Sequence, residues 1–204
     1  MKKHVESLSD CKEALTSLCI ESVDMSNTHF LYNIFLSCIL DRALSVNKGY
    51  RALTESNNYF CAVTMLRMQI ENCTRLYGMT LVDDASKFIM SWMDGEKISK
   101  FQDKETHKSL SDSYVASILD KQYKNIAAMY KEACSFVHFS ERQLYDTAKV
   151  KPGTRIVNLK VSEEDFLKDE ERHNIDKCML IVNNILIDIV KNISKEYVQP
   201  TRVK

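Results

Sequence analysis

This chain of 204 residues, 45% of them hydrophobic, is long enough to bury one core of ordinary size, so we predict a single helical domain over residues 1–204. Its 28 lysines and arginines balance its 28 aspartates and glutamates, which excludes an overall positive field that would bind nucleic acid nonspecifically. Seven cysteines without a C-x-x-C pair favour a reducing, cytoplasmic compartment, and the absence of a long apolar run predicts no membrane partner.

Glycine and proline are scarce in most of the chain, which predicts the fold class. Before residue 150 there are three glycines and no proline, so few positions force the backbone out of a helix. Apolar residues at helical spacing, with polar caps, predict an all-α bundle of about six helices. In chain order, these helices cover residues 8–18, 30–46, 54–80, 83–92, 111–138 and 162–193. We expect the second helix to stop at Asn47-Lys48-Gly49, and we expect Asp83 or Asp84, Ser111 or Asp112, and Ser162 to act as caps.

Two segments break the helical pattern. Residues 96–110 are polar and form a predicted linker, which we expect to be the least ordered part of the domain. Residues 149–161 read KVKPGTRIVNLKV, in which a Pro-Gly turn separates two short β-prone runs. We therefore predict one small β-hairpin near residues 149–161.

The central helix carries a narrow stripe of charge. Between Phe60 and Thr80 the only charged residues are Arg67, Glu71 and Arg75, which share one side of a helix because they stand at i, i+4 and i+8. Both flanks of the stripe are largely apolar, which indicates a helix surrounded by protein. The three residues therefore form an exposed ladder of salt bridges, a buried structural network or a functional site.

A histidine at the end of the next long helix is the second candidate. On a continuous helix His138 follows Tyr130 and Cys134 at intervals of four residues, so we expect it to project from the inward face. It is either a core histidine bonded to backbone at a helix end or a group of a functional site. If the two long helices pack together, His138 faces the arginine stripe, and the polar pocket between them suits general acid or base catalysis.

Several common chemistries are excluded by the sequence. There is no G-x-G-x-x-G, no G-x-x-x-x-G-K and no G-x-S-x-G, and these motifs supply the glycines that phosphate cradles and nucleophile elbows require. Glu170 and His173 have the spacing of a helical metal-ligand pair, but the second pair and the further glutamates of a di-iron site are missing. We therefore predict no metal and no cofactor.

The sequence also resembles a known group of proteins. The pattern RMQIENCTRLYG, the tryptophan-containing short helix, a second long helix and the run SFVHFS are similar to bacterial all-helical proteins of the abortive-infection and HEPN type. The likeness covers roughly residues 55–145. It implies a helical bundle, commonly homodimeric, that acts as a metal-independent ribonuclease in toxin or phage-defence systems. The family's signature places an arginine shortly before a histidine; here only His138 matches, and Lys131 precedes it where arginine's bidentate phosphate contact is needed.

Two function classes remain open. In the first, a HEPN-like ribonuclease, His138 is the general acid or base, Arg67 and Arg75 hold the scissile phosphate of RNA, and Glu71 orients an arginine. The residues predicted to bind substrate are Lys131, Ser140, Asn72 and Tyr130. In the second, a noncatalytic interaction or regulatory module, the same polar residues form a structural network and an apolar face binds a partner protein or a second copy. An accessible, positive cleft that contains His138 favours the ribonuclease, whereas a network that is closed by its own salt bridges and sealed from water favours the module.

Overall fold

The computed structural model describes residues 5–22, 30–138, 141, 143, 147–150, 152–159, 161 and 167–195. Over these residues the protein is mainly α-helical, as predicted from its scarcity of glycine and proline. Its helices are α1 (Leu8–Ser22), α2 (Phe30–Glu55), α3 (Tyr59–Gly78), α4 (Ala85–Met93), α5 (Asp112–Leu119), α6 (Ile126–Val137) and α8 (Asp169–Ile193). Short 3-10 turns occupy Met79–Leu81 and Ile98–Lys100.

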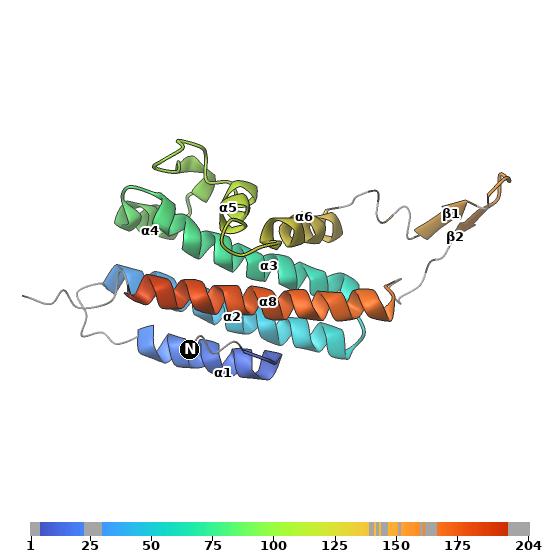
Figure 1. Ribbon diagram of the computed structural model, residues 1–204, viewed down its shortest axis with the longest axis horizontal. Coiled ribbons are helices and arrows are strands. Elements are labelled where there is room, and N and C mark those ends of the chain that lie inside the picture. Colours follow the sequence, from blue (N-terminus) through green and yellow to red (C-terminus); the bar gives the residue numbers. More distant parts are fainter. Residues whose placement is uncertain are drawn as a thin grey trace, which may run out of the picture.

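The helix α3 lies at the centre of the bundle. It packs against α2 and α8 on one side and against α5 and α6 on the other, while α1 covers α2 and α8 (Figure 1). Its buried apolar residues therefore point in more than one direction, and Val63 contacts a small cluster with α6 while Ile70 belongs to the main core. The sequence-based prediction that this helix is surrounded by protein is confirmed.

The helix α2 does not stop at Asn47-Lys48-Gly49, and that prediction is wrong. Asn47 is buried, and its side-chain amide donates to the backbone carbonyl of Ala43 one turn earlier. The residue therefore lies in the middle of the helix and not at its end. A Cβ at Gly49 would lie 3.1 Å from Sδ of Met65 in α3. Glycine at this position therefore marks the close approach of two helices, where a Cβ would press on the flexible side chain of Met65, and not a turn. The chain turns later, where Asn57 has a φ of 59°.

The predicted long helix over residues 111–138 is two helices, α5 and α6. The Ser111 hydroxyl accepts from the backbone N–H of Tyr114 at 3.2 Å, which confirms the predicted cap of α5. The helix ends after Leu119, and the turn that follows contains Asn125 with a φ of 74°. Within this turn the hydroxyl of Tyr123 donates to Asp188 of α8 at 2.7 Å. The break thus lets a side chain from this layer reach across to α8.

Residues 96–110, predicted as a polar linker, form a folded loop on the bundle. Ile98 and Leu110 are buried at its two ends. The carboxylate of Asp103, also buried, accepts hydrogen bonds from two backbone amides in the loop and from the hydroxyl of Tyr114 in α5. Burial opposes ionisation of Asp103, but these donors together hold its pKa below the usual value. Polar residues in this segment therefore satisfy the backbone of a compact turn.

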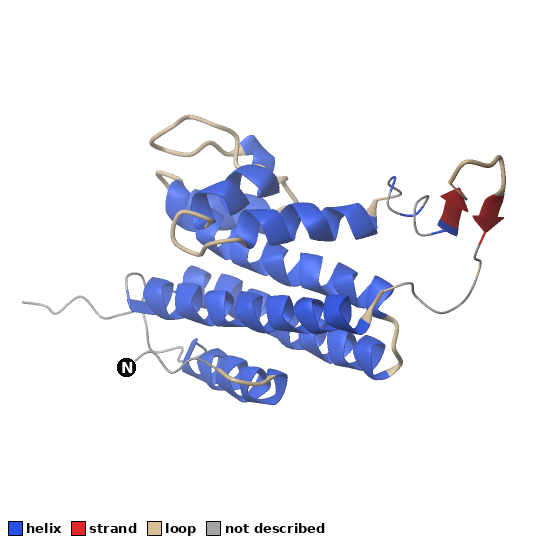
Figure 2. Cartoon of the chain, turned by 45° about the vertical axis from the view of Figure 1, so that its right-hand side comes forward, coloured by secondary structure: helices blue, strands red, loops and turns tan. Residues whose placement is uncertain are grey.

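The predicted hairpin is present with shorter strands. The strands β1 (Ala148–Val150) and β2 (Val157–Leu159) are antiparallel, and the register pairs Ala148 with Leu159 and Val150 with Val157. Gly153 has a φ of 74°, as the Pro-Gly turn requires. Figures 1 and 2 show the hairpin clear of the helices. The predicted cap Ser162 lies outside the described residues, and α8 begins at Asp169.

Candidate functional site

The charged stripe of α3 lies between helices. The side chains of Arg67, Glu71 and Arg75 are 16%, 26% and 21% exposed, so they are neither sealed from water nor free in it. An exposed ladder of the kind seen on a surface helix is therefore the wrong description. At this depth a charge is costly unless another charge or a hydrogen bond compensates it.

Asp112, in the first turn of α5, lies between the two arginines of the stripe. Its Oδ1 is 2.9 Å from Nη1 of Arg75, and its Oδ2 is 3.3 Å from Nη2 of Arg67. Glu71 is 3.0 Å from Nη2 of Arg75 on the same helix. From the sequence, Asp112 is predicted only as a possible helix cap. Asp112 can pair with these arginines only because α5 packs against α3, and the sequence does not show which helices pack together.

A further arginine, Arg42 of α2, completes the ionic part of the network. Its Nη2 is 3.0 Å from Oε2 of Glu71, and its Nη1 donates to the side-chain oxygen of Asn72. Glu71 therefore lies between Arg42 and Arg75. Burial opposes ionisation of this carboxyl, but the two guanidinium groups outweigh burial and hold the pKa of Glu71 below its usual value. The sequence does not predict that Arg42 belongs to this network, because the residue lies on a different helix.

Tyr130 and Cys134 of α6 both contact Arg67. The guanidinium carbon of Arg67 lies 4.2 Å from the centre of the Tyr130 ring, and its Nε donates to Sγ of Cys134 at 3.3 Å. Nη2 also donates to the Tyr130 hydroxyl at 3.1 Å. Burial lowers the pKa of Arg67, but the contacts with Cys134, Tyr130 and Asp112 together raise it above its usual value. The guanidinium of Arg67 is thus fixed in place by contacts with α5 and α6.

His138 does not project from the inward face, and that expectation is wrong. The helix α6 ends at Val137, and His138 follows it with extended backbone, φ −94° and ψ 140°. The four-residue spacing from Tyr130 and Cys134 therefore no longer sets its direction, and its side chain is exposed. Within the described part of the chain, no hydrogen bond or ion pair joins it to the arginine stripe.

The residues predicted to bind substrate are separated as well. Lys131 is exposed on the outer side of α6, whereas Tyr130 contacts Arg67. Asn72 is only 1% exposed, because it lies beneath Arg42 inside the bundle. Ser140 lies outside the described residues. The structure therefore brings Tyr130 and Asn72 to the network and leaves Lys131 outside it.

A chain of buried amides extends the network to α8. Nδ2 of Asn72 donates to Oε1 of Gln69 at 2.9 Å, and Nε2 of Gln69 donates to Oδ1 of Asn183 at 2.7 Å. Asn183 and Asn47 then exchange two hydrogen bonds, of 2.8 and 2.9 Å, between α8 and α2. One polar network therefore links α5, α3, α2 and α8 across the core. The sequence did not predict it, because each amide alone resembles an ordinary polar position in a helix.

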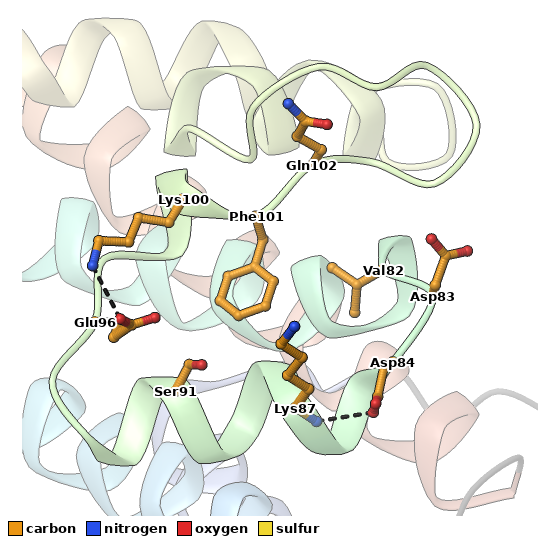
Figure 3. Close-up of a pocket in the computed structure, with 9 residues that line it drawn as sticks. All are labelled: Val82, Asp83, Asp84, Lys87, Ser91, Glu96, Lys100, Phe101 and Gln102. Atoms are coloured by element: carbon orange, nitrogen blue, oxygen red, sulfur yellow. Dashed lines mark hydrogen bonds and ion pairs between the residues drawn. The ribbon is translucent and has the colours of Figure 1, made fainter.

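Two hollows lie near the network. The larger, about 630 Å³, is open to solvent, and it is lined by Glu71, Arg75, Trp92, Glu96, Lys97, Ile98, Ser99, Ser111, Asp112, Ser113 and Tyr130. This lining has three carboxylates against two cations, and His138 is not part of it. The smaller, about 440 Å³, lies between α4 and the 96–110 loop, where Lys100 pairs with Glu96 at 3.0 Å (Figure 3). It has three carboxylates against two lysines, so neither hollow is a positive cleft.

The described residues form neither a metal site nor a membrane-spanning helix. No group of three or more histidine, cysteine, aspartate or glutamate side chains there is placed to hold a metal ion. Among the same residues, no helix has both the length and the apolar character needed to cross a bilayer. Comparison with protein-family models, curated proteins and solved structures gives no match for this chain.

Proposed function

We propose that this protein is a noncatalytic helical interaction module, in which the polar network built on Arg67, Glu71 and Arg75 is structural. The observation that carries this proposal is the pairing of the arginines. Arg75 contacts both Glu71 and Asp112, and Arg67 contacts Asp112 as well, so each of these arginines already pairs with a carboxylate of the protein. A guanidinium that must hold a scissile phosphate needs free donors facing solvent.

The charge of the adjoining pocket supports the same proposal. A ribonuclease site has to attract and stabilise the negative charge of phosphate, and it needs its general acid or base within hydrogen-bonding reach of the reacting oxygens. The pocket beside Arg75 has an excess of carboxylates, and His138 does not line it. That the protein is a HEPN-like ribonuclease of a toxin or phage-defence system stays a prediction. One experiment distinguishes this function from that of a noncatalytic interaction module.

The experiment compares RNA cleavage and stability in the same set of variants. Wild type, His138→Ala, Arg75→Ala and Arg51→Ala are incubated with mixed RNA in EDTA, after circular dichroism has shown that each variant folds. Arg51 is the matched control, because it is an exposed arginine whose pair with Glu55 at 3.8 Å lies on the surface of α2. We expect no cleavage by any of the proteins.

The free energy of unfolding then distinguishes the half-buried Arg75 from Arg51, which lies on the surface. Arg75→Ala leaves Glu71 and Asp112 with less compensation at partial burial, so we expect it to lower the free energy of unfolding by about 3 kcal/mol. Arg51→Ala should cost about 0.5 kcal/mol or less. Metal-independent cleavage by wild type that His138→Ala abolishes, with the fold intact, would sink the module proposal and establish the ribonuclease.

A further inference from the structure

The β1–β2 hairpin is the part of the chain that neither the bundle nor the polar network accounts for. It stands clear of the helices in Figures 1 and 2. Ile156, Val157, Leu159 and Val161 are 55%, 51%, 70% and 89% exposed. A two-stranded hairpin is marginally stable in water by itself and gains stability when an apolar face is covered. These exposed apolar side chains therefore indicate that the hairpin is more stable when a partner covers its apolar face.

Strand geometry gathers the apolar residues of the hairpin. Successive residues of a strand alternate between its two faces, so Val157 and Leu159 share one face and Asn158 lies on the other. The register pairs Val157 with Val150 and Leu159 with Ala148, which are also apolar residues. The one remaining strand pair, Lys149 with Asn158, is polar. The hairpin is thus amphipathic.

The charge of this segment has one sign. Residues 148–161 contain three lysines and one arginine and no aspartate or glutamate, although the whole chain has a net charge of zero. Arg155, at the end of the turn, is exposed. A partner of the hairpin therefore needs negatively charged groups next to an apolar region.

We propose that the hairpin binds the surface of an anionic lipid bilayer. Val157, Leu159 and Val161 enter the boundary between headgroups and acyl chains, while Arg155 contacts lipid phosphates and the lysines in the sequence of the segment add to its positive charge. An apolar surface combined with several basic residues is the pair of signals that gives reversible binding to anionic membranes. The sequence-based expectation of no membrane partner came from the lack of a spanning segment, and binding at the surface needs none.

Other partners fit these observations less well. RNA would be attracted by the cations, but it would leave the aliphatic side chains uncovered, and residues 148–161 contain no aromatic residue on which bases can stack. A second copy that packed its hairpin on the first would bring two segments of like charge together, which opposes association. The lipid proposal does not depend on whether the bundle is catalytic.

Binding to vesicles tests the proposal. The full chain is sedimented with vesicles of phosphatidylcholine mixed with phosphatidylglycerol, and separately with vesicles of phosphatidylcholine alone. We expect binding only to the anionic vesicles, and we expect it to weaken as salt is raised. The double variant Arg155→Ser/Leu159→Ser should weaken binding roughly 50-fold, since it removes one cation and one large apolar side chain from the contact.

The matched control changes the same two kinds of side chain away from the hairpin. Lys121→Ser/Met90→Ser removes an exposed lysine and a methionine that is 58% exposed, and it should bind as wild type does. Absence of binding to the anionic vesicles, or equal weakening in both double variants, overturns the proposal. Hairpin-dependent binding of a single-stranded RNA, or hairpin-dependent dimerisation, without binding to vesicles also overturns it and identifies the other partner.

Discussion

Replacing Asn183 by alanine should destabilise the bundle strongly, because Asn183 joins three helices through side-chain hydrogen bonds. Its side chain is fully buried. Oδ1 accepts from Asn47 at 2.8 Å and from Gln69 at 2.7 Å, and Nδ2 donates to Asn47 at 2.9 Å and to the carbonyl of Met179 at 2.9 Å. The position therefore tests whether the amide chain contributes to stability.

The magnitude follows from the groups that Asn183→Ala leaves behind. The side-chain amide of Gln69 and the side-chain oxygen of Asn47 lose their partner in the core, and each buried polar group without a partner costs roughly 1–3 kcal/mol. A small cavity adds to this cost. We expect a total loss of about 4 kcal/mol, a large fraction of the roughly 5–15 kcal/mol that stabilises a typical domain.

Urea denaturation followed by circular dichroism measures this loss, with Asn184→Ala as the matched control. Asn184 is the next residue of α8, and its half-buried side chain bonds to the backbone of Val5 near the start of the described chain. Its replacement should cost about 1 kcal/mol. If Asn183→Ala cost no more than this control, with an unchanged dependence on urea, the reasoning would be refuted. Combining Asn183→Ala with Asn47→Ala should show a coupling of about 1–3 kcal/mol.

Three further changes test other parts of the structure. Glu71→Gln removes the anion between two arginines and should cost about 3 kcal/mol near neutral pH. Because folding lowers the pKa of Glu71 from its ordinary value of 4.5, the carboxylate stabilises the protein at pH values above 4.5 and loses this effect as the pH falls. The denaturation midpoints of wild type and Glu71→Gln should therefore converge in acid. Midpoints that stay equally far apart at every pH would contradict this expectation. Gly49→Ala should change stability by less than about 1 kcal/mol, since the flexible Met65 can shift by a few tenths of an ångström, whereas Gly49→Val should lose about 1–3 kcal/mol in thermal melts. Ser111→Ala removes the cap of α5 and should cost about 1 kcal/mol in urea, against no measurable cost for the exposed Ser117→Ala.

Local chemistry predicted most of the helices and the caps at Asp84 and Ser111, while the ends of some helices depended on packing. Ser111 and Asp84 cap their helices as expected, because a side-chain oxygen and an amide three residues later suffice for that contact. The helix end predicted at Asn47-Lys48-Gly49 was wrong because residues of other helices, and not neighbours in the sequence, decide the conformation there. Asn47 and Gly49 match a helix end in type, but their conformation is set by Asn183 in α8 and Met65 in α3.

The candidate site divides in the same way. The four-residue spacing correctly placed Arg67, Glu71 and Arg75 together on α3, since that spacing is a property of a single helix. The groups that compensate their charge, Arg42 and Asp112, come from α2 and α5, and only the packing of those helices brings them in. His138 was misplaced because the spacing argument assumed a helix that continues past Val137.

The pattern of pairing explains how a central helix can carry three charged residues. Arg67 and Arg75 meet the carboxylates of Asp112 and Glu71, and Arg42 adds a third cation from a neighbouring helix. Asp112 joins α5 to both arginines of α3, and Arg42 joins α2 to Glu71. Sliding α3 by one turn would therefore separate charges that are costly to leave alone at this depth. Hydrophobic burial is not directional, so the apolar residues that flank the stripe specify this register less sharply than the ion pairs do. We therefore infer that the ionic network fixes the register of α3 against α2 and α5, while the apolar core supplies most of the stability.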